Sequence, residues 1–518
     1  MTTFTVKSPS NNQTLYEVNE PLDSDILWIY KKAGDVFEKI RDMPVEQRVQ
    51  ETLKLQKYII ENREKIITRI VQETGKCRTD ALTSEIFGVL DIIEYYKKEA
   101  PRALADKKAH TPLILMGKKS KIYHDPLGTV LIISPWNYPF YLALVPCISA
   151  FLAGNSVIFK PSEITPLKGL LEEIFEKSGF MNEAIQVVYG SKETGQKLIE
   201  AKPVKIFFTG SVKTGKKIME SAAKNLIPVE LELGGKDPMI VFADVNLDRT
   251  VNGAMWGAFT NAGQSCTSVE RVYVQEEIYS RFVSKLEEKV NQLKLGSDSN
   301  LGQDKGDIDM GSMTAEFQVK IVEEHIEDAV NKGARILCGG KREKDSLFFP
   351  PTILLNVNPT MKIINEETFG PVMPVIKFST EEEVIKKAND SDLGLSASVW
   401  SKDLVRAERV ARKLEVGNVS INNVMLTEGN PALPFGGVKS SGFGRYKGEY
   451  GLYAFTNIKS VIIDSQSAKV EANWYPYTRN KYNIFSDLLE ALFSNKGSLV
   501  KTIMSGMKLE SSANKEKI

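Results

Sequence analysis

One cysteine of this chain stands in sequence surroundings that suit nucleophilic chemistry. Cys266 follows Gly263, where a helix from about Leu247 is expected to stop, and it precedes a β-rich run from Val269 to Val274. The thiol is therefore predicted on a connecting loop. A cysteine there can be aimed at a substrate, whereas a cysteine in an apolar stripe is usually inert packing.

One glutamate suits the role of a base for that thiol chemistry. Glu232 interrupts the apolar alternation of Val229, Leu231 and Leu233, and two glycines follow it. We expect its carboxylate at the end of a buried strand, where burial raises the pKa of a carboxyl group toward the range of a general base. Together the two residues predict a thiol nucleophile and a general base.

The elements that must position these residues follow an α/β pattern. Between Gly128 and Phe242, short β-rich runs alternate with amphipathic helical runs, which is typical of a parallel sheet wrapped by helices. Such a sheet binds ligands beyond the carboxyl ends of its strands. The expected strands are 129–134, 156–160, 185–189 and 204–209, and the expected helices are 141–152, 166–178, 190–201 and 212–224.

A second alternation runs from Val269 to Asn422 and predicts a second α/β domain. Its helices are expected near 280–293, 314–331, 381–388 and 404–414, and further helices at about 23–98 precede the first sheet. The tail beyond Asp464 has two amphipathic stretches, 484–493 and 499–507, before a polar end, SSANKEKI, that is expected to be disordered. The stretches fit a membrane-surface helix or, as the favoured interpretation, packing against the chain's own body or a partner subunit.

Composition narrows the class of protein. The chain has 518 residues, 42% of them hydrophobic, and a net charge of +1 from 67 Lys and Arg against 66 Asp and Glu, which argues against nucleic-acid binding. Four scattered cysteines and a polar start without an apolar signal segment predict a cytoplasmic location. With three histidines and no clustered ligands, no metal site is expected, and we treat Cys77, Cys147 and Cys338 as structural.

Seven separated motifs, in order, resemble the aldehyde dehydrogenase superfamily over about residues 23–464. They are SPWNYPF, FKPSEITP, FTGSVKTG, LELGGK, GQSC, EETFGPV and PFGGVKSSGFGR. The wording of WNYPF, LPFGGV and the YPY of the tail is most similar to the class 3 and fatty-aldehyde branch. The longer N-terminus is less typical of that branch.

The resemblance implies an architecture. It consists of two doubly wound α/β domains, namely a Rossmann-like cofactor domain at 1–107 and 127–235 and a catalytic domain at 236–445. A small β oligomerisation extension is expected at 108–126 and 455–466, followed by a C-terminal tail at 467–518. Relatives pair through such an extension, so a homodimer or homotetramer is expected.

The resemblance also implies a reaction for the three matched catalytic residues. Cys266 attacks the aldehyde carbonyl to give a thiohemiacetal, which yields a hydride to the nicotinamide and becomes a thioester. Glu232 then activates water, and Asn137 matches the side chain that stabilises the oxyanion. Relatives that transfer the acyl group to coenzyme A generally lack this glutamate. Its presence therefore favours a free acid over an acylating reaction or a binding role without turnover.

Cofactor contacts are implied for ten matched positions. They are Trp136, Lys160, Glu163, Gly210, Ser211, Gly215, Leu233, Gly234, Glu367 and Phe369. Gly210 and Gly215 lie between an expected strand and helix, where backbone N–H groups can meet a pyrophosphate, although glycines end strands for many reasons. The carboxylate of Glu163 suits the ribose hydroxyls of NAD, while class 3 relatives with this glutamate also use NADP. Trp136, Tyr138 and Phe140 favour an apolar aldehyde as substrate.

Overall fold

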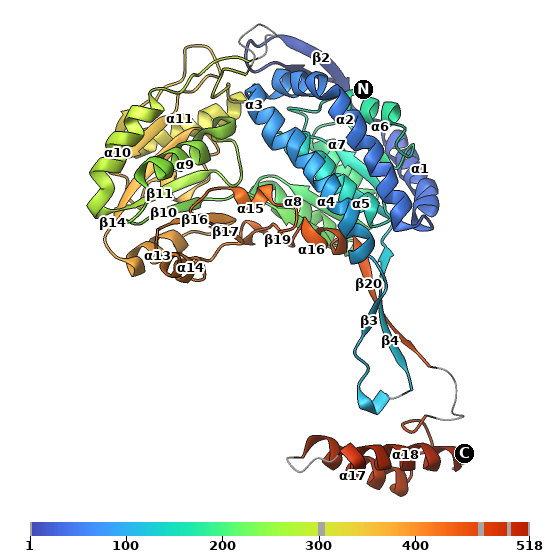
Figure 1. Ribbon diagram of the computed structural model, residues 1–518. Coiled ribbons are helices and arrows are strands. Elements are labelled where there is room, and N and C mark those ends of the chain that lie inside the picture. Colours follow the sequence, from blue (N-terminus) through green and yellow to red (C-terminus); the bar gives the residue numbers. More distant parts are fainter. Residues whose placement is uncertain (1–2, 116, 299–305, 465–470, 495–498, 516–518) are drawn as a thin grey trace. The chain divides into compact units, whose positions relative to one another are not determined.

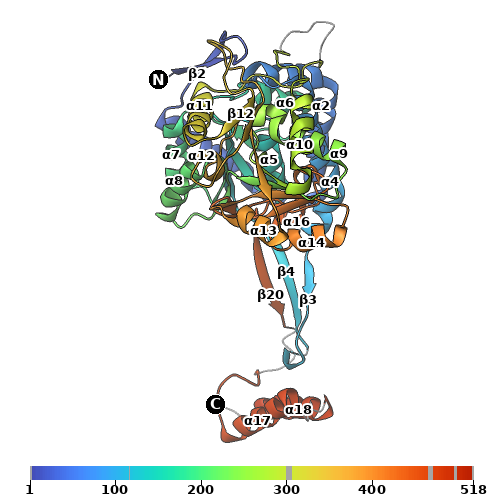
Figure 2. The ribbon, with the colours of Figure 1, turned by 90° about the vertical axis from the view of Figure 1, so that its left-hand side faces the viewer.

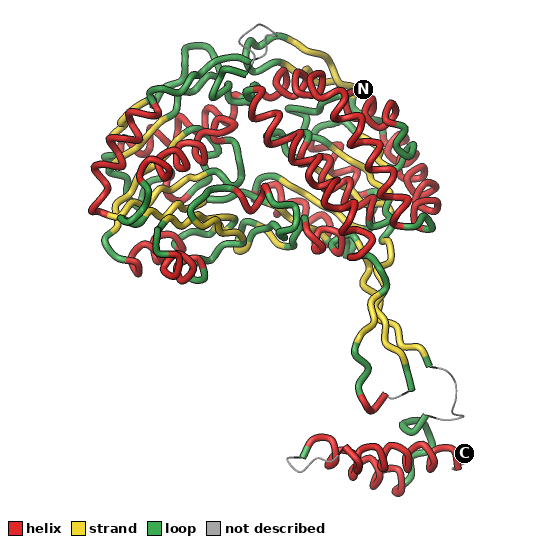
Figure 3. Tube along the Cα trace, in the orientation of Figure 1, coloured by secondary structure: helices red, strands yellow, loops and turns green. Residues whose placement is uncertain are grey.

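The computed structural model describes residues 3–115, 117–298, 306–464, 471–494 and 499–515. The chain divides into two compact units. Unit 1 comprises Met1–Leu104 and Asp125–Asn457, and unit 2 comprises Ala105–His124 and Ile458–Ile518. Figure 1 traces both along the sequence, and Figure 3 distinguishes their helices and strands.

The first sheet of unit 1 has the strand order β19-β9-β8-β5-β6-β7. All neighbours pair in parallel except the edge strand β19. The strands are β5 (Thr129–Ile133), β6 (Ser156–Lys160), β7 (Ile185–Val187), β8 (Lys205–Thr209), β9 (Val229–Glu232) and β19 (Gly442–Phe443). The helices between them are α5 (Tyr141–Leu152), α6 (Leu170–Ser178), α7 (Lys192–Glu200) and α8 (Val212–Ala223).

Both faces of this sheet are buried because successive residues of its strands enter different cores. Val130 and Ile132 of β5 pack with helices α2, α4 and α5, whereas Leu131 and Ile133 pack with α1, α7 and α8. The N-terminal elements are β1 (Thr3–Lys7), β2 (Thr14–Asn19), α1 (Asp23–Arg41), α2 (Val45–Thr74), α3 (Arg78–Asp80), the π-helix η1 (Ala81–Ile86) and α4 (Phe87–Ala103).

The second sheet has the strand order β12-β13-β14-β11-β10-β16-β17 and is parallel except at β12. Its strands are β10 (Asp237–Val241), β11 (Val269–Gln275), β12 (Arg335–Cys338), β13 (Thr352–Leu355), β14 (Val372–Phe378), β16 (Ser396–Trp400) and β17 (Asn418–Ile421). Met239 and Ile240 of β10 again enter separate cores, so this sheet is covered on both faces.

The helices of this second layer are α9 (Leu247–Phe259), η3 (Thr260–Gly263), α10 (Glu276–Val290), α11 (Glu316–Asn331), α12 (Lys362–Asn365), α13 (Glu381–Asn389) and α14 (Leu404–Ala411). Short elements complete unit 1: β15 (Leu393–Gly394), α15 (Leu426–Gly429), β18 (Val438–Lys439) and α16 (Gly448–Tyr453).

Unit 2 has a three-stranded sheet of order β20-β4-β3 and a pair of helices. The strands are β3 (Lys107–Ala109), β4 (Lys119–Pro126) and β20 (Thr456–Ile463), with the short η2 (Leu113–Leu115) between β3 and β4. The helices are α17 (Arg479–Phe493) and α18 (Leu499–Lys515), which pack against one another (Figure 2). No helix among the described residues is long and apolar enough to span a membrane.

The fold class predicted from the sequence is confirmed, because two doubly wound α/β sheets and a small β extension are present. Three details were wrong or missed. The helix expected to run to Gly263 ends at Phe259, since Asn261 and Ala262 adopt left-handed φ angles of 53° and 54°. The expectation of a disordered SSANKEKI end was wrong as far as Lys515, to which α18 extends, and 516–518 lie outside the described residues. The β1–β2 hairpin was not predicted.

The side chain of Asn155 joins segments around the first sheet that are separated along the chain. Its Oδ1 accepts hydrogen bonds from the backbone N–H groups of Leu127 and Gly128, and its Nδ2 donates to the carbonyls of Ala150 and Phe455. Because the side chain is buried, Asn155→Ala removes a partner from the N–H groups of Leu127 and Gly128 and from the Phe455 carbonyl, whereas the Ala150 carbonyl still accepts from the backbone N–H of residue 155. We expect a loss of about 2–4 kcal/mol in the free energy of unfolding, measured in urea. An unchanged urea midpoint would contradict this role.

Candidate active site

The carboxyl edge of the first sheet gathers several predicted site residues. Glu232 ends β9 and pairs in register with Thr209 of β8, so Gly210 follows beside it and donates its N–H to the Glu232 carbonyl at 3.0 Å. Ile133 of β5 pairs with Lys160 of β6. The WNYPF segment after β5 and the loop after β6 therefore leave the same edge, as expected for a doubly wound sheet.

Cys266 reaches that region from the second sheet. It lies on the loop between η3 and β11, and it is partly buried. A Cβ built on Gly235 would stand 2.6 Å from the carbonyl oxygen of Cys266, a distance that real Cβ atoms do not reach. The turn after β9, which carries Glu232, therefore touches the cysteine loop at a position where only glycine fits.

Asn137 is also brought to the cysteine loop. Its Nδ2 donates to the carbonyl of Gln264 at 3.0 Å, two residues before Cys266. Its own carbonyl accepts from Lys76 Nζ at 2.8 Å and from Asn261 Nδ2 at 3.2 Å. One amide hydrogen of Asn137 is left to donate, and these contacts fix its direction. The structure thus brings the three predicted catalytic residues together.

Burial controls the protonation of the candidate base. Glu232 is 4% exposed, and its Oε2 has no hydrogen-bond partner among the described residues. Burial raises the pKa of Glu232 well above its usual value, the nearby Glu230 and Glu428 raise it further, and Arg445 opposes them. A buried carboxyl oxygen without a protein partner is suited to hold a water molecule or a proton.

The thiol of Cys266 is also held in its neutral form. Burial raises its pKa well above the usual value, and Glu428, Asp237 and Glu367 add to the effect in that order, with a smaller contribution from Glu232. A cysteine surrounded by carboxylates is a poor nucleophile until a proton acceptor or a positive charge enters the site.

The loop before β14 carries the predicted residues Glu367 and Phe369. A Cβ on Gly234 would stand 2.1 Å from Glu367 Oε2, and Gly235 N donates to Glu367 Oε1 at 3.1 Å. Phe369 has a positive φ of 50°, and its ring meets that of Trp136 edge to face with centroids 5.3 Å apart. Both predicted residues therefore lie at the turn after β9 and at the WNYPF segment.

An ion pair that the sequence reasoning missed holds this loop in place. The buried side chains of Lys236 and Glu270 form a salt bridge, and Lys236 Nζ also donates to Thr368 Oγ1 at 3.1 Å. Glu270 accepts from the N–H groups of Thr368 and Phe369, both at 2.9 Å. Lys236 ends the LELGGK motif, but no sequence pattern marks its partner inside the strand β11.

The remaining predicted cofactor positions surround the start of α8 and the end of β6. Lys160 is buried, and its Nζ lies 3.6 Å from Glu163 Oε2 on a carboxyl group that is partly exposed. Ser211 caps α8 by accepting from Thr214 N. A Cβ on Gly215 would stand 2.8 Å from the side chain of Leu233, so this helix packs tightly on the turn after β9.

These residues fit a dinucleotide. The first turn of α8 presents its backbone N–H groups at the carboxyl edge of the sheet, which suits a pyrophosphate. The Lys160 and Glu163 pair suits a ribose. Ser134, at the end of β5, is buried and its Oγ has no partner among the described residues, so this edge still offers a polar atom to a ligand. Among the described residues no cluster of potential ligands could hold a metal ion.

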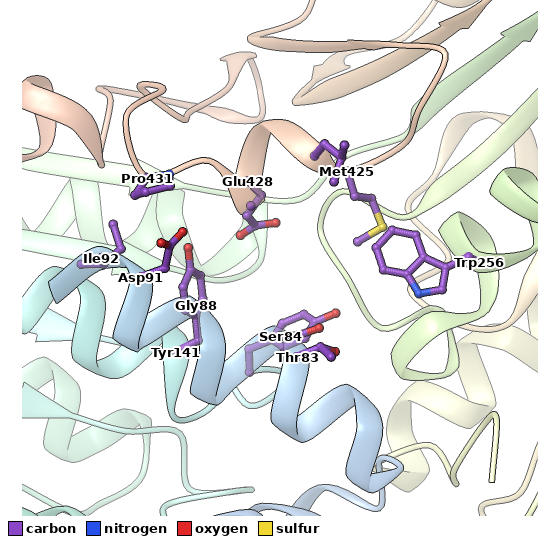
Figure 4. Close-up of a pocket in the computed structure, with 13 residues that line it drawn as sticks. Thr83, Ser84, Gly88, Asp91, Ile92, Tyr141, Trp256, Met425, Glu428 and Pro431 are labelled. Atoms are coloured by element: carbon purple, nitrogen blue, oxygen red, sulfur yellow. The ribbon is translucent and has the colours of Figure 1, made fainter. Parts of the chain in front are cut away.

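A pocket of about 180 Å³ opens beside the cysteine loop (Figure 4). Ile92, Tyr141, Trp256 and Met425 are among the residues that line it, and none of the lining residues is a lysine or arginine. Glu428 links it to the cysteine loop, because Thr267 Oγ1 donates to Glu428 Oε2 at 3.3 Å. The pocket is largely apolar, and its charged lining residues are acidic. Sequence reasoning missed Glu428, a single acidic residue in the short helix α15.

Comparison with known proteins decides the family. The model of the Aldehyde dehydrogenase family matches residues 1–461. The chain belongs to this family. Members use NAD or NADP and oxidise aldehydes, so the coarse activity and the cofactor class predicted from the sequence are confirmed.

Individual relatives of this aldehyde dehydrogenase have different named substrates. The chain is 42% identical to 4,4'-diapolycopene aldehyde oxidase of Methylomonas sp over 504 residues, 96% of this chain and 93% of that one. It is 38% identical to an NADP-dependent succinate-semialdehyde dehydrogenase of Escherichia coli over 78% of this chain and 83% of the other. A point mutant of Staphylococcus aureus betaine aldehyde dehydrogenase in complex with NAD+ superposes with a TM-score of 0.83, at 32% identity over 92% and 96% of the chains.

The substitution Glu270→Gln tests the missed ion pair. It removes the negative charge that faces the buried Lys236, and breaking such a pair costs about 3–5 kcal/mol of stability. We expect a lower melting temperature and a raised KM for NAD+, because the loop with Glu367 and Phe369 loses its anchor. Glu276→Gln on α10, a solvent-facing site, is the control. An unchanged KM with intact folding would show that the pair does not position this loop.

Proposed function

We propose that this enzyme oxidises an apolar aldehyde, aliphatic or aromatic, to the carboxylic acid through a covalent intermediate on Cys266. The proposal is carried by one observation, the meeting of the Glu232 turn with the Cys266 carbonyl at Gly235, with Asn137 held on the same loop. A nucleophile, a base and an amide donor converge there. These are the groups that acyl chemistry on a thiol requires.

Each residue has a distinct task in this proposal. The thiolate of Cys266 adds to the aldehyde carbon. The carbonyl oxygen becomes negative and accepts a hydrogen bond from the remaining side-chain N–H of Asn137. When bound, the oxidised nicotinamide supplies a hydride acceptor, so the thiohemiacetal becomes a thioester. Glu232 then takes a proton from water as the water attacks the thioester carbonyl. The acid leaves and the Cys266 sulfur is regenerated.

The pocket beside the cysteine loop supports an apolar substrate. Burying a hydrocarbon substrate against its aromatic and aliphatic lining is favourable. Glu428 and Asp91 would repel a substrate that carries a carboxylate. The 96% coverage of the Methylomonas relative means that its alignment must enter the C-terminal tail, whereas the semialdehyde dehydrogenase alignment covers 78% of this chain. This favours 4,4'-diapolycopene aldehyde over succinate semialdehyde as a guide to substrate class.

Cofactor preference and assembly complete the proposal. The Glu163 carboxylate favours NAD+ over NADP+, because it would repel a 2′-phosphate. We expect a homodimer or homotetramer through the sheet of unit 2, whose strand β20 exposes Ile458 and Ile462.

Enzyme assay tests the function directly. We expect NADH formation at 340 nm with hexanal, decanal and benzaldehyde, and at least about tenfold lower kcat/KM with succinic semialdehyde. Cys266→Ala should give no NADH, and Cys147→Ala, a substitution of a buried structural cysteine, should retain activity. Activity retained by Cys266→Ala would refute the thiol mechanism. A rate that requires coenzyme A would establish the acylating alternative.

The raised pKa of Glu232 predicts how the rate depends on pH. Because the base must be ionised and burial raises its pKa well above the usual carboxyl value, kcat should rise with pH at pH values above those where an ordinary carboxyl group titrates, when thioester hydrolysis is limiting. In Glu232→Gln that rise should disappear, and kcat should fall about 100-fold or more. In stopped-flow measurement, Glu232→Gln should form one equivalent of NADH per site before the slow phase. Absence of this burst together with a normal kcat in the variant would contradict the assignment of Glu232 as the base for thioester hydrolysis.

A further inference from the structure

The two tail helices of unit 2 carry more apolar surface than their own packing uses. The two helices contact one another, and Leu488 and Ala491 of α17 and Leu509 of α18 are buried. Figures 1 and 2 both show the helices side by side. A helix pair that faced only water would carry polar residues on its outer side.

The outer side of α17 is instead a second apolar stripe. Tyr482, Leu489 and Phe493 are 74%, 61% and 79% exposed. Their spacing of seven and four residues places them on one face of the helix. On α18, Val500, Met504 and Met507 are spaced by four and three residues, which also places them on one face, and each is more than half exposed. Each helix therefore presents one apolar face inward and another outward.

Aromatic residues with polar ends precede these helices. Trp474, Tyr475 and Tyr477 are each more than half exposed. Tryptophan and tyrosine are the side chains enriched where lipid headgroups meet water, because one end of each ring is apolar and the other forms hydrogen bonds. This composition favours a lipid interface over a dry protein contact.

The two units also differ in net charge, and this difference favours a lipid surface too. The sequence of unit 2 has 14 lysines and arginines against 7 acidic residues, which leaves 53 against 59 in unit 1. Unit 2 is thus strongly cationic in a chain whose net charge is +1. An anionic membrane would attract such a surface.

We propose that the C-terminal part of unit 2, residues 471–515, docks on the surface of an anionic lipid bilayer. The outer stripe of α17 enters the boundary between headgroups and acyl chains, and exposed basic residues such as Arg479 and Lys508 face lipid phosphates. The segment lies on the membrane and does not cross it, since no described helix is apolar and long enough to span.

Vesicle sedimentation tests the docking with the full-length enzyme. We expect binding to vesicles of phosphatidylcholine with phosphatidylglycerol, and about tenfold weaker binding to pure phosphatidylcholine or at high salt. Leu489→Ser with Phe493→Ser should weaken binding about tenfold or more, because both side chains leave the interface. Activity on hexanal should be unchanged, since neither residue lies in the pocket beside Cys266.

The matched control changes the same kind of surface in unit 1. Leu404 and Val405 of α14 are 58% and 74% exposed, so Leu404→Ser with Val405→Ser removes similar apolar area and should leave vesicle binding at the wild-type level. The proposal is overturned if the wild-type enzyme stays in the supernatant with anionic vesicles, or if the tail variant sediments as well as the control. A changed molar mass in light scattering with unchanged vesicle binding would assign the stripe to a second copy.

Discussion

The active site depends on the contact between Gly235 and the carbonyl of Cys266. The turn after β9 belongs to one sheet and the cysteine loop to the other, and the 2.6 Å clearance for a Cβ leaves room for hydrogen alone. In the proposed mechanism, displacing either loop by the width of a methyl group would move Glu232 away from the position from which it acts on a thioester at Cys266. Backbone packing between loops of the two sheets therefore sets the relative positions of the Glu232 and Cys266 side chains.

Electrostatics add a second constraint, because four carboxyl groups, Glu428, Asp237, Glu367 and Glu232, act on the thiol of Cys266. Burial raises the pKa values of Asp237 and Glu367 to about 8, and the thiol of Cys266 shares their surroundings. In this state the sulfur is protonated, and a protonated thiol resists oxidation. In the proposed mechanism, the Cys266 thiol becomes reactive when positive charge enters the site or when the thiol loses its proton.

Elements that depend on a local sequence pattern could be predicted from the sequence. The strand at 156–160 and the helix at 141–152 were predicted with the bounds that the structure has, because both have a mainly apolar interior and clear ends. The break after Phe259 could not be predicted, since Asn261 and Ala262 take left-handed angles under the hydrogen bonds of distant Asp80. Glu270 and Glu428 were missed for the same reason. Their partners lie far along the chain, and no local spacing reveals a contact of that kind.

The apolar pocket and the apolar tail lie in different units, but the same hydrophobic effect acts on both. A hydrocarbon chain gains about 0.8 kcal/mol for each CH₂ removed from water, so an apolar aldehyde, the proposed substrate, also prefers a bilayer. Such a substrate is scarce in water and concentrated in lipid. An enzyme held at the membrane surface meets it at the higher concentration, and the acid it forms leaves more readily, because a carboxylate is costly to keep in hydrocarbon. Docking would thus serve both substrate capture and product release without any change at Cys266.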